Sequence, residues 1–261
     1  MINFDYIKAV ESAKKHGELH QYTQIEALEY IINNRALLFK RIDKLNDTIE
    51  NKKNSNIWKS KIYTACFTHR KCESYFFWET YAKGNPNGVR VSFNSEFLRD
   101  LSLHPDEQCK QPSLLASKEK DYDIPFSADV TADFWEVYDY TLIDVVYVPR
   151  NMNMDDITRF QGRFKYEEWD MECETRARVA VRPIGRDAKN KKTDIEYLTP
   201  NNERLFGKLS QGCLESMKIT LNPYANENLE NRVNELLRKN GLYGKIKVNK
   251  SILLGEIQRN V

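Results

Sequence analysis

The sequence has no apolar run that approaches the ~20 residues of a membrane-spanning helix. Its first residues, Met1 to Asp5, show neither the basic start nor the apolar stretch of a secretory signal. Its five cysteines have no paired spacing, which is typical of reduced thiols rather than a disulfide framework. With four histidines and no Cys-x-x-Cys motif, a structural zinc site is not expected. These absences predict a cytoplasmic protein without disulfides or a structural metal.

A strong net charge is also lacking, because 40 basic residues face 38 acidic ones. No global field therefore favours a nucleic acid or a membrane as partner. The 261 residues, 41% of them hydrophobic, are enough for a self-sufficient core. No repeat and no Pro/Gly/Ser-rich linker interrupts the chain. We therefore predict a single α+β domain over residues 1–261, with its core at about 20–252 and a mixed or antiparallel central sheet flanked by helices.

Hydrophobic periodicity locates the elements of this domain. Helical spacing predicts helices at residues 4–14, from Thr23 to 33–34, at 71–83, at 151–168 and at 227–239. In the second of these, Thr23 is the expected N-cap and Glu26 completes a capping box. Strands are predicted at residues 36–42, 62–67, 89–93, 140–148 and 217–221.

The most informative segment is residues 171–181, which alternate almost without a break and predict one strand with two unlike faces. One face carries Met171, Cys173, Thr175, Ala177, Val179 and Val181, and the other carries Glu172, Glu174, Arg176 and Arg178. Four charges in a row on an otherwise core-like strand indicate either a solvated edge or the floor of a polar site.

Three blocks of residues resemble one bacterial family. They are His20–Thr23 followed by a helix and Leu45-Asn46-Asp47 with Glu50; Cys66-Phe67, Phe77–Ala82 and Gly88–Phe93; and Lys165, Trp169, Glu172, Glu174 and Arg176. Together they resemble the domain-of-unknown-function family 2971, over most of residues 20–252. This chain departs from the family at Thr48, where a proline is usual. The resemblance implies a fold but no reaction.

The order of elements is also similar to that of ADP-ribosyltransferase-like folds, and this similarity implies an NAD or nucleotide site. A catalytic carboxylate would stabilise positive charge as the glycosidic bond breaks, and an aromatic face would stack on nicotinamide. Under this hypothesis the expected catalytic residues are Glu174, Glu172 and Tyr81. The expected cofactor-binding residues are His20, Tyr22, Thr23, Trp78 and Arg176, with NAD as the candidate cofactor.

Two alternatives stay open. In the first, Glu172 and Glu174 hold a divalent metal of a hydrolase or nuclease, with Asp47 or Asp144 as third ligand. Arg176 stands where such a site would have a lysine, and an arginine cannot act as the base. In the second, the protein is a non-catalytic binding or regulatory module of a phage-defence or toxin–antitoxin system, and the aromatic run at Tyr75–Tyr81 is a platform for a protein or nucleic acid.

Overall fold

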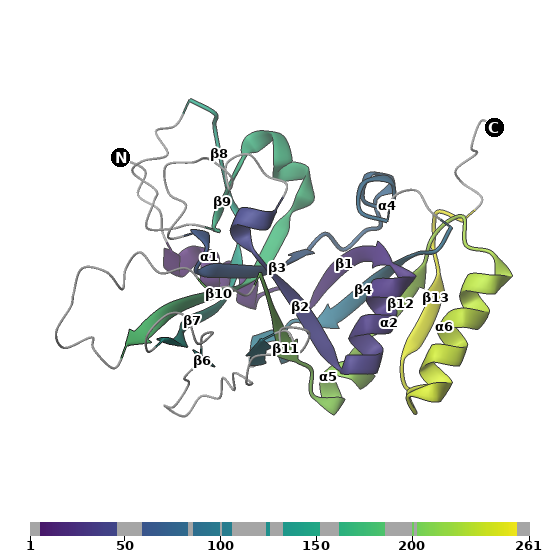
Figure 1. The fold of residues 1–261 in the computed structure, drawn as a ribbon. Coiled ribbons are helices and arrows are strands. Elements are labelled where there is room, and N and C mark those ends of the chain that lie inside the picture. Colours follow the sequence, from purple (N-terminus) through teal and green to yellow (C-terminus); the bar gives the residue numbers. More distant parts are fainter. Residues whose placement is uncertain are drawn as a thin grey trace. The chain divides into compact units, whose positions relative to one another are not determined.

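The computed structural model describes residues 6–45, 59–82, 86–99, 101–105, 124–125, 133–151, 162–185, 200 and 203–254 (Figure 1). The chain folds into two compact units. The first unit comprises Met1–Lys15, Leu37–Cys66 and Arg99–Lys208, and the second comprises His16–Ala36, Phe67–Leu98 and Leu209–Val261.

The first unit is built on β-strands. In sheet order they are β6 (Ile124–Pro125), β7 (Asp133–Asp144), β10 (Glu174–Gly185), β3 (Ile62–Thr68), β2 (Ala36–Arg41), β11 (Arg204–Lys208) and β5 (Ser102–Pro105). Helix α1 (Tyr6–Lys14) packs against β7. The parallel pair β8 (Val146–Val148) and β9 (Phe164–Tyr166) leads into a 3₁₀-helix, η5 (Glu167–Glu172).

Strand β10 is the inner element that positions the charged residues of this unit. It pairs antiparallel with β7, so that Thr175 lies opposite Asp144 and Arg178 opposite Thr141. From Glu174 to Val181 every side chain is buried, on both faces of the strand. A strand that is buried on both faces usually reads as a continuous apolar run. Here one face is charged instead, so each charge needs a partner inside the protein.

The second unit has a sheet in the order β13 (Lys247–Lys250), β12 (Lys218–Leu221), β4 (Gly88–Asn94) and β1 (Glu18–Gln24). Strand β4 pairs antiparallel with β1 and β12, whereas β12 and β13 are parallel. Helices α2 (Ile25–Asn34) and α5 (Gln211–Ser216) pack against this sheet, and α6 (Glu227–Lys239) packs against α2. A short helix, α4 (Tyr75–Thr80), follows β3 (Figure 1).

Helix α6 forms where its sequence pattern predicts it, and the pattern explains why. The Asn226 side chain caps the helix by accepting a hydrogen bond from the Leu229 amide at 3.1 Å. Acidic residues occupy its first turn and basic residues its last, which suits the helix dipole. Its buried stripe is Leu229, Val233, Leu236 and Leu237. Because α6 connects the parallel strands β12 and β13, the three elements form a βαβ unit.

The predicted α+β class, with a mixed and largely antiparallel sheet flanked by helices, is confirmed. The single domain over residues 1–261 stays a prediction. The chain divides into two compact units, and strand β3 contributes residues to both of them. No helix among the described residues is long and apolar enough to cross a membrane.

Several predicted boundaries were wrong. Thr23 lies within β1, and the N-cap of α2 is Gln24, which makes no side-chain cap hydrogen bond.

Other elements also begin or end at different residues than predicted. Helix α4 begins only after Ser74, and the strand predicted at 140–148 is interrupted at Val145, between β7 and β8. Residues 162–168, predicted as helix, contain β9 and the start of η5, while residues 152–161 lie outside the described residues, as do Asn46, Asp47, Thr48 and Glu50.

Candidate functional site

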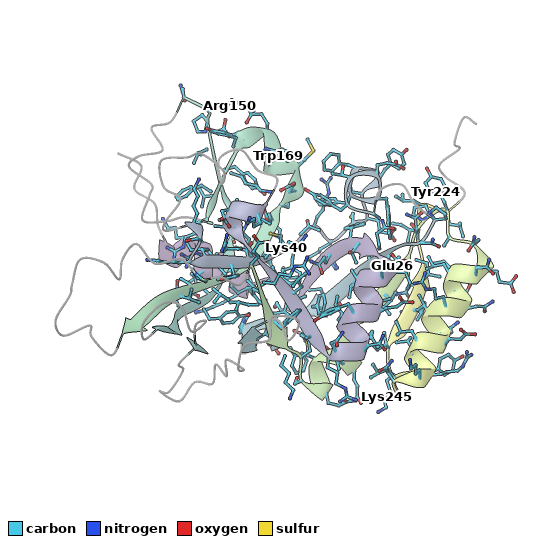
Figure 2. All side chains as sticks on the ribbon, in the orientation of Figure 1. Glu26, Lys40, Arg150, Trp169, Tyr224 and Lys245 are labelled. Carbon is cyan, nitrogen blue, oxygen red and sulfur yellow. The ribbon has the colours of Figure 1, made fainter. Side chains whose placement is uncertain are left out.

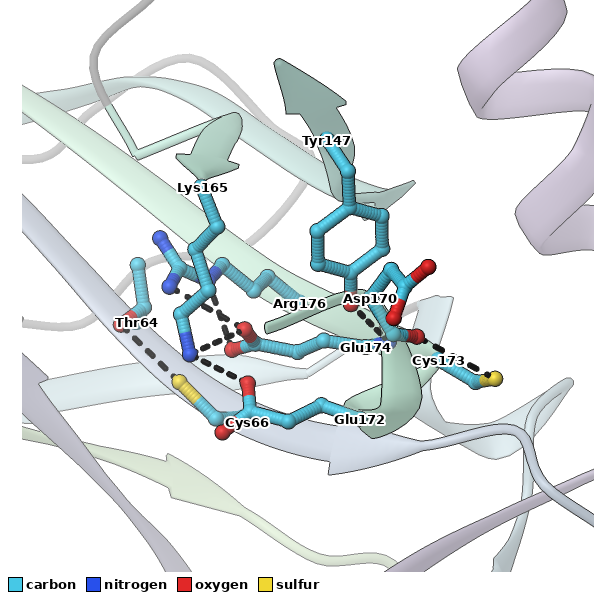
Figure 3. A network of polar contacts seen from close by, with 9 residues as sticks. All are labelled: Thr64, Cys66, Tyr147, Lys165, Asp170, Glu172, Cys173, Glu174 and Arg176. Carbon is cyan, nitrogen blue, oxygen red and sulfur yellow. Dashed lines mark hydrogen bonds and ion pairs between the residues drawn. The ribbon is translucent and has the colours of Figure 1, made fainter. Parts of the chain in front are cut away.

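The charged face of β10 forms a closed cluster of ion pairs in the first unit (Figure 3). Arg176 binds Glu174 through two parallel contacts, Nε to Oε1 at 2.7 Å and Nη2 to Oε2 at 3.2 Å. The Lys165 ammonium from β9 lies 2.9 Å from Glu174 Oε2 and also donates to Glu172. All four side chains are buried. Two cations thus face two anions, and the cluster is balanced in charge.

The pKa of Glu174 reflects these contacts. Burial by itself would raise this pKa, but the positive charges of Arg176 and Lys165 outweigh burial and lower it to about 2. Burial raises the pKa of the neighbouring Cys66 thiol, which keeps it protonated and unreactive. The Tyr147 hydroxyl accepts a hydrogen bond from the Glu174 amide at 2.9 Å. Glu174 is therefore a fixed carboxylate whose two oxygens already have cationic partners.

The start of the predicted strand was wrong. Glu172 is the last residue of η5, and Cys173 has a positive φ of 43° before β10 begins. Glu172 therefore reaches the cluster from a helical turn and not by strand alternation. Cys173 is half-buried rather than packed on an apolar face, and Met171 is exposed. Arg178 forms its own ion pair with Asp139 at 2.6 Å. The charged face is buried, so it is no solvated edge.

The arrangement gives no support to a metal held by Glu172 and Glu174. Lys165 contacts both carboxylates at the place where such a site would need its cation. The candidate third ligand Asp144 instead accepts a hydrogen bond from Thr175 at 2.6 Å. Thr175 follows Glu174 in β10, so its side chain points to the opposite face of the strand. The other candidate, Asp47, lies outside the described residues.

A second polar surface lies on the sheet of the second unit. In the antiparallel registers, His20 lies opposite Ser92, and Tyr22 lies opposite Arg90. Across β4, Thr220 lies opposite Arg90 and Lys218 opposite Ser92. Side chains of directly opposed residues share a face, so these six residues line one side of the sheet. We call them the polar face: His20, Tyr22, Arg90, Ser92, Lys218 and Thr220.

Arg90 stands out on this face as a buried charge without an ion pair among the described residues. The side chain is only 7% exposed, its Nη2 donates to the Lys71 carbonyl oxygen at 3.1 Å, and its Cζ lies 5.7 Å from the centre of the Tyr22 ring. Within the part of the chain that the structure describes, its buried Nε has no hydrogen-bond partner, and no carboxylate forms an ion pair with it. Burying an unpaired charge costs several kcal/mol, whereas a bound anion would offset that cost.

His20 adds a neutral, polar neighbour to Arg90. Its Nδ1 lies 2.8 Å from Ser92 Oγ, and the ring is buried. Burial, followed by the charges of Arg90 and Lys218, lowers the pKa of His20 from 6.5 to about 3. The imidazole is therefore neutral at neutral pH. Because the Lys218 ammonium is paired with Glu18, Arg90 is the cation of this face that has no carboxylate partner among the described residues.

This lowered pKa predicts a loss of stability in mild acid. Below pH 6.5 the unfolded chain takes up a proton on His20 that the folded chain refuses, so stability falls as the pH decreases toward 3. Between pH 6.5 and pH 5 this single group contributes about 1.6 kcal/mol of that loss. Urea unfolding at pH 6.5 and at pH 5 should show a smaller decrease in the free energy of unfolding for His20→Asn than for the wild type. Equal losses in the two proteins would contradict the assignment of the pKa shift to His20.

The aromatic residues next to the polar face form a column of stacked rings. Tyr22 stacks on Phe77 with ring centres 5.1 Å apart, and Phe77 stacks on Tyr81 at 5.6 Å. The outer ring, Tyr81, is 39% exposed. Trp78 meets Tyr22 edge-on at 4.8 Å but is fully buried, with its Nε1 donating to Glu73. Tyr81 therefore offers exposed ring area to a ligand, and Trp78 offers none.

The structure groups the predicted site residues in two sets. Glu172, Glu174 and Arg176 meet in the first unit, where Arg176 is committed to Glu174. His20 and Tyr22 share the polar face of the second unit, whereas Thr23 follows Tyr22 in β1 and points to the opposite face. Sequence reasoning missed Arg90. The sequence contained one sign of it, because Arg90 is the single charged residue in Val89–Phe93, whose other members are apolar or small. All five residues are buried in the structure.

Comparison of the chain with protein-family models, with curated proteins and with solved structures finds no match. The resemblance to domain-of-unknown-function family 2971 therefore stays a prediction, and the function has to be argued from the site.

Proposed function

We propose that this protein binds a nucleotide, with NAD as the first candidate, and that the polar face of the second unit holds its phosphate group. The observation that supports this most directly is the buried guanidinium of Arg90, which has no carboxylate partner among the described residues. Arginine binds phosphate oxygens with charge-assisted, geometrically specific hydrogen bonds. Ser92 and Thr220 supply hydroxyl groups on the same face, where the Lys218 ammonium is already paired with Glu18.

The aromatic column supplies the second half of the proposal. Tyr22 contacts both Arg90 and Phe77, and Phe77 contacts the exposed ring of Tyr81. A planar base or nicotinamide ring can extend such a column by offset stacking. A phosphate-binding arginine beside a column of stacked rings matches the two chemical parts of a nucleotide.

The contacts of the polar face and the aromatic column support binding and no chemical step. Transfer of ADP-ribose with Glu174 as the catalytic carboxylate would need a carboxylate that is free to face the ribose. In the structure both oxygens of Glu174 are bound by cations, and its side chain is buried. These contacts support a structural role for Glu174 more than a catalytic one.

The test is the substitution Arg90→Gln, measured by calorimetric titration with NAD, AMP, pyrophosphate and adenosine. We expect the variant to bind NAD, AMP and pyrophosphate about 10- to 100-fold more weakly than the wild type, because a charge-assisted hydrogen bond contributes about 1.5–3 kcal/mol. Adenosine has no phosphate, so its binding should not depend on Arg90. In thermal unfolding the free variant should be no less stable than the wild type, since an unpaired buried charge has been removed.

The matched control is Arg238→Gln. Arg238 is an exposed arginine of the same unit, near the C-terminal end of α6, and its guanidinium lies over the ring of Tyr243, which follows the helix. The Arg238→Gln variant should bind all four compounds as the wild type does. The proposal fails if wild-type protein binds none of the phosphorylated compounds, or if Arg90→Gln binds them as tightly as the wild type does.

A further inference from the structure

A groove of about 380 Å³ lies at one end of the βαβ unit formed by β12, α6 and β13. It is lined by the ends of the two parallel strands, Leu221 with Asn222 and Lys250 with Ser251, and by the first turn of α6. Tyr224, labelled in Figure 2, belongs to the connection between β12 and α6. In α/β units, ligands commonly bind beyond the carboxyl ends of parallel strands, where the helix N-terminus favours negative charge.

The side chain of Asn222 gives an independent sign of a ligand. It lines the groove and is 1% exposed. Its Oδ1 accepts a hydrogen bond from the Tyr224 amide at 2.8 Å, which fixes the orientation of the carboxamide. Its Nδ2 is buried and has no partner among the described residues. A buried donor without an acceptor costs about 1–3 kcal/mol, so an acceptor brought by a ligand would be stabilising.

The remaining lining residues decide which ligand fits. Lys250 and the positive end of α6 join Asn222 as groups that favour a carboxylate. Glu227 and Glu230, one turn apart on α6, present carboxylates to the same groove, and Glu230 lies 3.4 Å from the Lys250 ammonium. A simple anion would be repelled by these two acids, and a simple cation would leave the donors unpaired. Leu221 and Leu254 supply apolar wall.

We propose that this groove binds a free α-amino acid with an apolar side chain. The carboxylate of the ligand accepts hydrogen bonds from Asn222 and the helix start, its ammonium pairs with Glu230, and its side chain lies against Leu221 and Leu254. The volume is in the range of small-molecule sites. This site shares no residue with the polar face of the second unit and does not rest on the proposed nucleotide binding.

The experiment titrates the full-length protein with L-leucine, leucine methyl ester and N-acetyl-L-leucine, using calorimetry and backbone amide NMR shifts. The ester lacks the carboxylate and the acetyl derivative lacks the ammonium, so each should bind about tenfold more weakly than leucine. Leucine should shift the amides of Asn222, Glu227 and Lys250. Absence of leucine binding at millimolar concentration overturns the proposal, as does equal binding of leucine and its acetyl derivative.

Two variants assign the binding to the groove. Asn222→Asp keeps the acceptor for the Tyr224 amide but replaces the donor with a negative charge, so leucine binding should be lost. Because this buried change can impair folding, Glu230→Gln provides a partly exposed second variant, with leucine binding about fivefold weaker. The matched control Glu235→Gln changes an exposed glutamate of the same helix that does not line the groove, and should bind leucine like the wild type. Unchanged leucine binding in Glu230→Gln would contradict the assignment of the ammonium.

Discussion

Glu174→Gln is expected to lower the free energy of unfolding by about 3 kcal/mol, because it leaves the buried cations Arg176 and Lys165 with too little negative charge. Arg176 is fully buried and directs two nitrogens at Glu174, and Lys165 shares its ammonium between Glu174 and Glu172. Glutamine has nearly the same shape, so packing is preserved and the loss of stability comes from removal of the negative charge. Urea unfolding at neutral pH measures the free energy of unfolding of both proteins.

The control is Glu168→Gln, which removes an exposed glutamate from η5 in the same unit. Its partner Arg150 is also exposed, and such surface ion pairs contribute about 0–1 kcal/mol. The same experiment separates the two roles considered for Glu174. A stable Glu174→Gln protein that has lost nucleotide binding or turnover would contradict the structural role and restore the catalytic one. A strongly destabilised protein would identify the cluster as part of the core.

Trp78→Ala is expected to cost about 3–5 kcal/mol of stability, the range for deletion of a large buried aromatic side chain. Trp78 is fully buried in a cluster with Tyr22, Phe77 and Ala82, against which Leu253 packs. Its loss opens a cavity beside Tyr22, the ring that contacts Arg90, so nucleotide binding should weaken as well. Thermal unfolding and titration with NAD measure the two effects.

Two further variants make this prediction specific. Trp78→Phe fills most of the space but gives up the hydrogen bond to Glu73, so it should cost less than Trp78→Ala. Phe76→Ala, on the same helix, removes a ring that is much more exposed and should have a small effect on stability. If Trp78→Ala unfolded at the same temperature as Phe76→Ala, Trp78 would not be part of the core.

Elements with a long and strict periodicity could be predicted from the sequence. Helix α6 has the predicted bounds because its stripe, its N-cap and its terminal charges agree. The short element α4 was predicted too long, since its aromatic residues fit a helix without marking where it starts. Residues 171–173 alternate like a strand, but the backbone turns through a 3₁₀-helix and a positive φ at Cys173 before β10 begins. Alternation over three residues does not distinguish these two conformations.

The candidate site was predicted only in part, for a related reason. His20 and Tyr22 were identified through the similarity to ADP-ribosyltransferase-like folds, and in the structure both lie on one face of the sheet of the second unit. Arg90, the residue on which the proposed nucleotide binding rests, was missed. Its isolation from the carboxylates of the described residues depends on which strands lie beside β4, and no local pattern contains that information. Trp78 was expected to contact a cofactor, but its burial is likewise a property of the packed cluster.

The sequence by itself determined the α+β class, most helices and strands, and the presence of a charged face on the strand that begins at Glu174, because these follow from periodicity and local propensity. Only the tertiary structure decided what the charges do. It brought Lys165 and Arg176 to Glu174 and so neutralised one set of charges inside the protein. It also surrounded Arg90 with a carbonyl group, an aromatic ring and a neutral histidine, and so left one buried positive charge without a carboxylate partner among the described residues.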